Sequence, residues 1–344
     1  GITLIGCLLG IVGFDTYLFS QKGIVVTSIF PFVLTVSMFM IVTLYKYLTE
    51  NKTKKLIRQT FSKYVSPSIV NEILSHPEKV ELGGTKKNVT IFFSDLRGFT
   101  TISEKLDPKV LTDMLNRYLT PMTHVIFDNK GTLDKYMGDA IMAFFGAPVE
   151  YGDHPFYACQ AALDSLKILK NLQEEFRKEG LPEIDMGIGI NTAEVSVGNM
   201  GSQIIRNYTV MGDGVNLASR LEGATKQYGV RILISEKTYS YVRDHFLCRK
   251  VDRVRVKGKT EPIDIYQLLC RKTEQPPFID LPLFEEAQKL FYATDFGQAK
   301  QLFQSFQQKN PEDQLVTLFI QKCEYFINHP PGPHWDGVTQ LETK

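Results

Sequence analysis

The sequence predicts an α+β protein, in which a ferredoxin-like βαββαβ sheet is preceded by an apolar helical hairpin and followed by further helices. Three observations lead to this prediction. Short β-rich runs alternate with amphipathic helical runs from residue 88 onward. Two long apolar runs occupy most of the first 45 residues, and a proline-rich break after residue 271 precedes two more amphipathic segments. A chain of 344 residues has room for two or three such modules.

The first module, residues 1–46, is expected to be a transmembrane helical hairpin. Residues 2–19 and 24–45 are almost wholly apolar, and each run is long enough to cross the roughly 30 Å hydrocarbon core of a bilayer. The short turn from Ser20 to Gly23 joins them, and Asp15 lies close enough to this turn to reach the interface. The alternative is a buried helical hairpin in the core of a soluble protein.

Basic residues after the second apolar run predict the orientation. The turn carries Lys22 alone, whereas six basic residues follow the second run, namely Lys46, Lys52, Lys54, Lys55, Arg58 and Lys63. The positive-inside rule therefore places residues 46 onward in the cytoplasm, at the inner (plasma) membrane. Because the chain starts with Gly1 rather than Met, we expect that sequence precedes it.

Residues 47–80 have the pattern of a helical connector. One helix face is predicted there, and Ser66-Pro67 interrupts it before a second short helix at 68–74. Such a segment could pair with its copy in a dimer and carry a signal inward. The alternative is a passive linker.

The soluble module, residues 81–271, contains the alternating elements. Asp107 is a good helix N-cap, and Pro108 suits the first helical position. Helices are expected at about 108–129, 154–178 and 215–227. Strands are expected at 89–93, 132–137, 140–145, 184–190, 194–198 and 230–234, with a last hairpin that turns at 257–259.

The last part of the chain is expected to be a linker, residues 272–282, and a helical extension, residues 283–344. Two amphipathic helices are predicted there, at 284–309 and 311–328, and residues 295–299 break the first in the manner of a TPR-like helix-turn-helix repeat. A single repeat cannot stand alone, so these helices should pack on the preceding module or bind a protein partner.

Composition excludes several classes of function. The formal net charge is +1, so nothing in the sequence suggests binding to nucleic acid. The five cysteines are scattered and form no C-x-x-C pair, which argues against a zinc site or a disulfide framework. The six histidines are dispersed as well and are expected to be structural or surface residues.

Asp95 and Asp139 are the candidate site residues, because each follows or precedes a short apolar run. A carboxylate beside a hydrophobic strand costs free energy unless it is paired, solvated or bound to a metal. Two of them on neighbouring strands would repel unless divalent cations lie between them, an arrangement that suits two-metal chemistry on a phosphate ester. Taken singly, each aspartate could instead be an ordinary turn former.

Four segments resemble the motifs of the class III nucleotidyl cyclases, in the order of that family. They are FSDLRGFT, KYMGD, YTVMGDGVNLASRLE and VKGKTEP, and the resemblance covers roughly residues 81–270. The family's reaction is cyclisation of a nucleoside triphosphate with release of pyrophosphate. The upstream segment YVSPSIVNEIL resembles the transducer of bacterial membrane-bound cyclases, many of which carry a CHASE2-type sensor.

The resemblance implies roles for single residues. Asp95 and Asp139 would bind two Mg²⁺ or Mn²⁺ ions, and the backbone amides of about 96–100, including those of Phe99 and Thr100, would contact the phosphates. Two residues of the predicted helix at 215–227 lie four positions apart and so share one face. Of these, Asn216 would orient the ribose and Arg220 would stabilise charge on the α-phosphate. Lys257 would bind the terminal phosphates.

The choice of base depends on Lys135 and Thr209. Lysine offers only donors and suits the N1 acceptor of adenine, whereas guanylyl cyclases carry glutamate at this position. Thr209 occupies the partner position, where its hydroxyl could accept from Lys135 or from the 6-amino group. The sequence therefore favours ATP as substrate, with a guanylate cyclase or a catalytically silent nucleotide-binding module as alternatives.

The family also implies a homodimer with active sites shared between subunits. Asp95 and Asp139 would come from one subunit, and the other would supply Lys135, Thr209, Asn216, Arg220 and Lys257. One departure from the family pattern is Ala193, where glycine is common. If that position required a positive φ, alanine would strain the turn.

Overall fold

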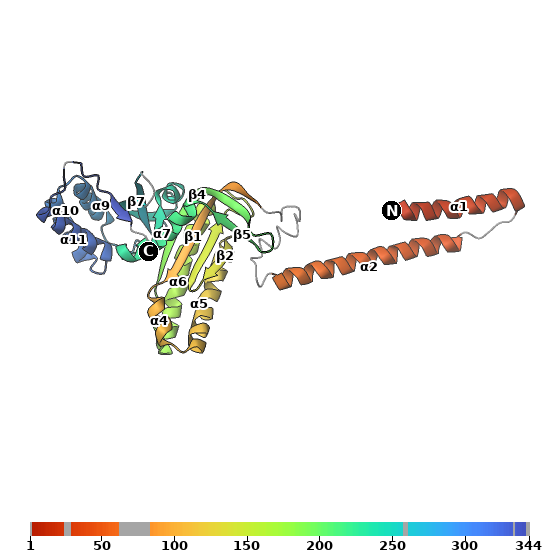
Figure 1. Ribbon diagram of the computed structural model, residues 1–344, viewed down its shortest axis with the longest axis horizontal. Coiled ribbons are helices and arrows are strands. Elements are labelled where there is room, and N and C mark those ends of the chain that lie inside the picture. Colours follow the sequence, from red (N-terminus) through yellow and green to blue (C-terminus); the bar gives the residue numbers. More distant parts are fainter. Residues whose placement is uncertain (1, 24–28, 62–82, 257–260, 333, 342–344) are drawn as a thin grey trace. The chain divides into compact units, whose positions relative to one another are not determined.

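The computed structural model describes residues 2–23, 29–61, 83–256, 261–332 and 334–341. These residues belong to two compact units, residues 1–74 and residues 75–344. The first unit contains helices α1 (Ile2–Lys22) and α2 (Ile29–Phe61) (Figure 1). The second predicted connector helix, at 68–74, lies outside the described residues.

Helix α2 carries the one segment of the described residues that is long and apolar enough to cross a membrane, Ile29–Leu48. Its large apolar side chains are exposed, as at Phe30, Met40 and Ile41. This segment overlaps the second predicted span. Length and composition alone give weak evidence, and the two-span hairpin stays a prediction.

The second unit begins with the predicted strand-helix-strand-strand-helix-strand order, and the α+β class is confirmed. In space the strands of this part lie in the order β2-β3-β1-β4, within one nine-stranded sheet formed by the described strands (Figure 1). Its elements are β1 (Gly83–Leu96), α4 (Phe99–Lys105), α5 (Pro108–Asp128), β2 (Thr132–Met137), β3 (Ala140–Phe145), α6 (His154–Lys178) and β4 (Met186–Gly201).

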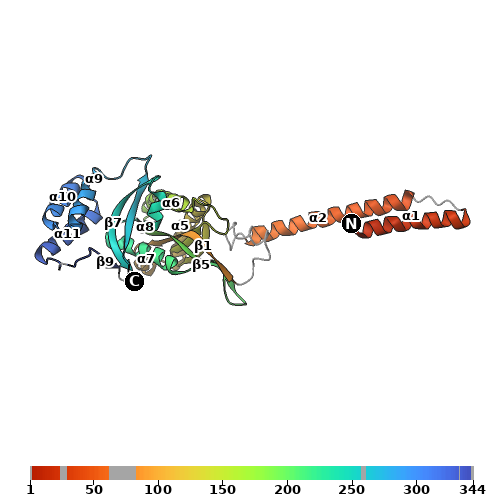
Figure 2. The same ribbon diagram turned by 90° about the horizontal axis from the view of Figure 1, so that it is seen from above.

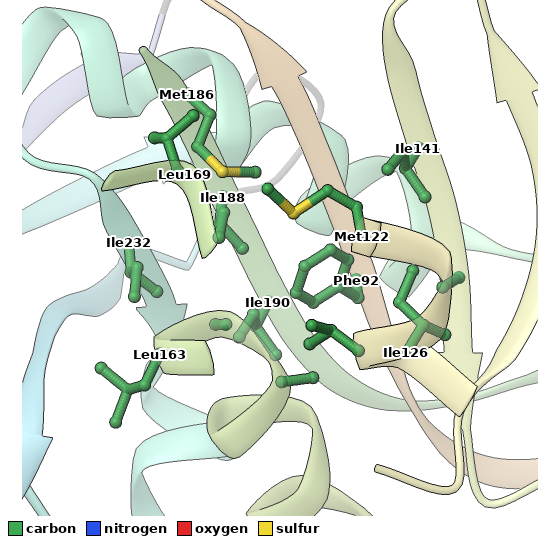
Figure 3. Close-up of a cluster of buried hydrophobic side chains, with 14 of the residues drawn as sticks. Phe92, Met122, Ile126, Ile141, Leu163, Leu169, Met186, Ile188, Ile190 and Ile232 are labelled. Carbon is green, nitrogen blue, oxygen red and sulfur yellow. The ribbon is translucent and has the colours of Figure 1, made fainter. Parts of the chain in front are cut away.

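Helices α5 and α6 cover one face of this sheet because each has one apolar side. The Asp107 side chain caps α5 by accepting from the Lys109 amide, as its position before Pro108 predicts. The main core lies between these helices and strands β1, β3 and β4 (Figure 3). Its labelled side chains include Met122 and Ile126 of α5, Leu163 and Leu169 of α6, Phe92 of β1, and Ile188 and Ile190 of β4.

The remaining elements of this part are β5 (Arg206–Met211), α7 (Asp213–Tyr228), β6 (Ile232–Ser235), α8 (Glu236–Val242), β7 (Phe246–Val256) and β8 (Ile263–Arg271). Helix α7 packs on the sheet face opposite α5 and α6, since Ala218 meets Ile91 and Phe93, which alternate with Phe92 along β1. Gly189 permits this close approach, because a Cβ there would stand 2.2 Å from the Glu222 amide nitrogen.

One strand prediction was wrong. The structure has a single strand, β4, where a hairpin of 184–190 and 194–198 was expected. Ala193 pairs with Val89 inside this strand, and it is not among the described residues with positive φ. Alanine therefore causes no strain at this position. Strand β5 and helix α8 were not predicted.

The described residues after β8 form helices α9 (Leu281–Tyr292), α10 (Phe296–Lys309) and α11 (Gln314–Asn328) and the short strand β9 (Thr339–Leu341). They lie beside β7 (Figure 2). Phe284, Phe303 and Phe319 of these helices share one hydrophobic core with Leu221 of α7 and Val254 of β7. The helices thus pack on the preceding domain, one of the two alternatives that the sequence left open.

Two buried carboxylates fix this contact. Asp252 of β7 accepts hydrogen bonds from Tyr228 of α7 at 2.8 Å and Tyr292 of α9 at 2.9 Å. Asp313 accepts hydrogen bonds from both guanidinium NH₂ groups of Arg249. It also accepts from the Leu315 amide and so caps helix α11. Both members of the Arg249–Asp313 pair are buried, so the two charges depend on each other.

Replacing Asp313 by alanine should therefore reduce the free energy of unfolding by about 3–5 kcal/mol, because it leaves the Arg249 charge buried without its partner. Urea unfolding followed by circular dichroism measures the change. The control is Glu194→Ala, which removes an exposed ion pair with Lys86 and should leave the urea midpoint unchanged. Equal midpoints for both variants would contradict this account of the contact.

Candidate active site

The site begins where β1 ends. This strand lies between β3 and β4. Asp95 is its next-to-last residue and pairs with Gly187 of β4. Alternation puts Asp95 on the same sheet face as Ile91 and Phe93, which is the face that α7 covers. The half-buried carboxylate of Asp95 is thus fixed by the central strand of the fold.

Asp139 reaches the same place from the tight turn between β2 and β3. Gly138 supplies the positive φ of 71° that this turn needs. The Leu96 amide donates to Asp139 Oδ2 at 3.1 Å, so the turn is held against the end of β1. Burial is the largest cause that raises the pKa of Asp139 to about 7, and a hydrogen bond that the protonated Asp139 donates to the Asp95 carboxylate, together with the charge of Asp95, adds to it. The two carboxyl groups predicted to act together are therefore in contact.

This pair fits a divalent cation of the hard type. Two carboxylates that repel each other in a partly buried place are stabilised when a cation shares them, and oxygen donors suit Mg²⁺ and Mn²⁺. The described residues contain no cluster of three or more candidate metal-ligating side chains. Magnesium sites that use only one or two carboxylates, with water and phosphate oxygens completing the shell, are common.

The loop after Asp95 leads into helix α4 through Gly98, whose φ of 69° is left-handed. The resemblance implied that the backbone amides of about 96–100 contact the phosphates, but two of these amides already donate to other groups. The Leu96 amide bonds Asp139, and the Arg97 amide bonds the Asp185 carbonyl at 2.8 Å. Phe99 packs against the main core, and Thr100 is exposed, so the amides at the start of α4 are the remaining candidates.

Helix α7 presents Asn216 and Arg220 away from its buried side. Leu217, Leu221 and Tyr228 of this helix are buried, whereas Asn216 is exposed and Arg220 is half-buried. The start of the helix is fixed by Asn191 of β4, whose amide donates to the Gly214 carbonyl at 2.8 Å. Sequence reasoning missed Asn191, although it lies next to Thr192 in a polar interruption of an otherwise apolar strand.

Lys135 and Thr209 are brought together by a residue that the sequence analysis did not single out, Asp134 of β2. Thr209 of β5 donates from Oγ1 to Asp134 Oδ2 at 2.5 Å. The Lys135 ammonium stands 3.0 Å from Asp134 Oδ1. The two predicted base-reading residues thus flank one carboxylate. Lys257 lies outside the described residues.

The fold and these groups of side chains define a nucleotidyl cyclase domain. A family model, the adenylate and guanylate cyclase catalytic domain, matches residues 83–270, more than half of the chain. The chain belongs to this family, and its sheet and helices are those of the cyclase fold.

Relatives of known structure support the assignment. The adenylyl cyclase CyaB from P. aeruginosa is 39% identical, with a TM-score of 0.52, and the match covers 55% of this chain and 96% of that one. The guanylyl cyclase Cya2 is 36% identical with a TM-score of 0.51, over 55% and 95% of the two chains. Sequence identity and TM-score therefore do not distinguish an adenylyl cyclase from a guanylyl cyclase.

A curated relative, the adenylate cyclase of Anabaena cylindrica, is 39% identical over 224 residues. This match covers 63% of the present chain and 44% of that protein. The chain thus spans less than half the length of this relative.

Proposed function

We propose that the protein is a membrane-anchored homodimeric adenylate cyclase, which converts ATP to 3′,5′-cyclic AMP and pyrophosphate for intracellular signalling. The observation that carries the proposal is the contact between the Asp95 and Asp139 carboxyl groups, in a domain whose helix α7 presents Asn216 and Arg220 on an accessible face. Such paired carboxylates suit phosphoryl chemistry assisted by divalent ions.

In this mechanism the ribose 3′-oxygen loses its proton to solvent water and bonds to the α-phosphorus, while the bond from the α-phosphorus to the leaving pyrophosphate breaks. Asp95 and Asp139 would hold two Mg²⁺ or Mn²⁺ ions, and these would supply Lewis acidity at the 3′-oxygen and neutralise the β- and γ-phosphates. Asn216 orients the ribose. Arg220 stabilises the charge that develops on the α-phosphate, and Lys257 binds the terminal phosphates.

The base contacts favour adenine. Lys135 has only N–H donors, which match the N1 acceptor of adenine and repel the N1–H of guanine. Thr209 supplies the second contact, and the first turn of α4, from Phe99 and Thr100, supplies backbone donors to the phosphates. A guanylate cyclase is the alternative, because Cya2 is as similar overall as an adenylyl cyclase. A catalytically silent module is disfavoured, since none of the candidate catalytic residues is lost.

Cyclase homologues act as dimers, and the distribution of side chains supports a dimer with two equal shared sites here. One subunit contributes Asp95 and Asp139, and the other contributes the base-reading and α7 residues. Large apolar side chains are exposed on the strands that carry the base-reading residues and on the hairpin between β4 and β5, as a second copy would require. They are Tyr136, Met137, Ile204, Ile205 and Met211.

The remaining parts of the proposal concern location and partners. Helix α2, with the exposed apolar segment Ile29–Leu48, would anchor the chain as part of a two-span hairpin in the inner (plasma) membrane, with the cyclase domain in the cytoplasm. The subtype would be the membrane-bound one with a CHASE2-type sensor. Helices α9–α11 would form a TPR-like extension with room for a protein partner.

The direct test incubates the purified protein with ATP and Mn²⁺ and measures cyclic AMP and pyrophosphate by chromatography. Equal amounts of both products are expected. Absence of cyclic AMP under conditions in which the protein is dimeric would overturn the proposal.

Exchanging Lys135 for glutamate should lower kcat/KM for ATP by about 10²-fold or more, because the donor to N1 becomes an acceptor. Parallel assays with ATP and GTP measure the change. Lys170→Glu, on the exposed side of α6, is the matched control and should leave both values unaltered. Undiminished ATP turnover in Lys135→Glu would rule out base reading by this lysine.

A further inference from the structure

Asp134 lies at an irregularity of strand β2. Leu133 pairs with Ala143 and Lys135 with Met142, so one extra residue, Asp134, stands between two consecutive partners on β3. Neighbouring residues of a regular strand point to opposite faces, but a bulge of this kind re-aims a side chain. It allows the carboxylate of Asp134 and the ammonium of Lys135 to meet at 3.0 Å.

The Asp134 side chain is fully buried, with 0% of its surface exposed. A buried carboxylate needs partners, and it receives a hydrogen bond from Thr209 at 2.5 Å and the nearby charge of Lys135. Lys135 and Asp134 Oδ1 form an ion pair, but Oδ1 accepts no hydrogen bond. The N–H donors of Lys135 can therefore still bind a ligand. The Lys135 side chain is 42% exposed and can turn these donors to a ligand.

The hydrogen bond to Asp134 decides what Thr209 can offer. Thr209 Oγ1 donates to Asp134 Oδ2, so the single hydroxyl proton of Thr209 points at this carboxyl group. The two lone pairs of the hydroxyl oxygen then remain for a ligand. Thr209, whose hydroxyl could donate or accept in isolation, is thereby made an acceptor.

We propose that Asp134 is the positioning residue that selects the purine, by making Thr209 an acceptor beside the donor Lys135. This inference rests on the proposed function. Adenine presents an acceptor at N1 and a donor at its 6-amino group, which match Lys135 and Thr209. Guanine and hypoxanthine present a donor at N1 and an acceptor at O6, which conflict with both. The carboxylate acts on the base only through its two neighbours.

The test compares ATP with inosine triphosphate as substrates of the full chain and of Asp134→Asn. Inosine has the N1–H and O6 of guanosine without its 2-amino group, so the comparison isolates hydrogen-bond polarity. The asparagine amide can donate to Thr209 and free the hydroxyl proton for O6. The ratio of kcat/KM for ATP to that for inosine triphosphate should fall about 10-fold or more.

Matched variants separate this role from a structural one. Asp128→Asn changes an exposed aspartate at the end of α5 and should keep the wild-type ratio. Thr209→Val should lower the ratio as Asp134→Asn does, and Thr209→Ser, which keeps the hydroxyl, should preserve it. The double variant Asp134→Asn/Thr209→Val should be no worse than Thr209→Val alone, because both changes act through one hydroxyl.

An unchanged ratio in folded Asp134→Asn would overturn the inference. If that variant fails to fold, the Thr209→Val and Thr209→Ser pair decides, and equal ratios in the two would overturn it as well. Failure of the proposed function looks different, because the wild-type protein would then make no cyclic product. In that case the same ratio is measured as the relative affinity for ATP and inosine triphosphate.

Discussion

Asp139→Asn should lower the rate of cyclic AMP formation by about 10²–10³-fold or more, since it removes one of the two carboxylates on which charge stabilisation at the phosphates depends. Asparagine is the informative replacement because its side-chain carbonyl can still accept from the Leu96 amide, which holds the β2–β3 turn in place. Cyclic AMP production at saturating ATP and Mn²⁺ measures the loss. Asp244→Asn, an exposed aspartate after α8, is the control and should be fully active.

Although Asp139→Asn should lose activity, it should gain thermal stability. Without metal at pH 8, it should melt at a higher temperature than the wild-type protein, because the repulsion between two partly buried carboxylates is gone. Added Mn²⁺ should raise the melting temperature of the wild-type protein and leave the variant nearly unchanged. An equal rise in both proteins would mean that the cation binds elsewhere.

Arg220→Ala should reduce turnover by about 10³–10⁵-fold, the range found when phosphoryl-transfer enzymes lose an arginine that stabilises the transition state. The main effect is expected on kcat rather than KM, because the charge on the α-phosphate grows as the reaction proceeds. Lys226→Ala removes an exposed cation from the same helix and should have little effect. Loss of activity in both variants would point to general disruption of α7.

A mixture of Arg220→Ala with Asp139→Asn tests whether the sites are shared. In a mixed dimer both defects fall in one site, and the other site is intact. Random pairing of equal amounts makes half of the dimers mixed, so about one quarter of wild-type activity should return. Mixing after brief exposure to mild denaturant allows subunits to exchange. If no activity returns although mixed dimers form, each site is built within one chain.

Much of the fold was predictable because its local signals are strong. The bounds of β2, β3 and α6 agree with the sequence prediction, since a tight Gly138-Asp139 turn separates the strands and α6 has a continuous apolar side. The error at β4 arose because Asn191 and Thr192 resemble a turn. In the structure their side chains are buried and hydrogen-bonded, to Gly214, Ser235, Thr90 and Thr238.

The candidate site also contains residues that the sequence could predict and residues that it could not. Asp95 and Asp139 could be proposed from sequence because each lies beside an apolar run and within a segment that resembles a cyclase motif, FSDLRGFT or KYMGD, although either one taken singly could be a turn former. Asp134 could not, because its position depends on a bulge in the pairing of β2 with β3, and a bulge leaves no pattern in a single strand. Asn191 was missed for a related reason, since its contact with Gly214 joins residues 23 positions apart.

The match to the cyclase family ends at residue 270, but the hydrophobic core continues into helices α9, α10 and α11. A protein shortened to that point would uncover Val251, Val254 and Leu221, and would leave Asp252 and Arg249 without their main partners. Such a fragment should aggregate or require solubilising substitutions on β7 and α7. Exchange of this tail between cyclases during evolution would therefore demand simultaneous changes on the domain that receives it.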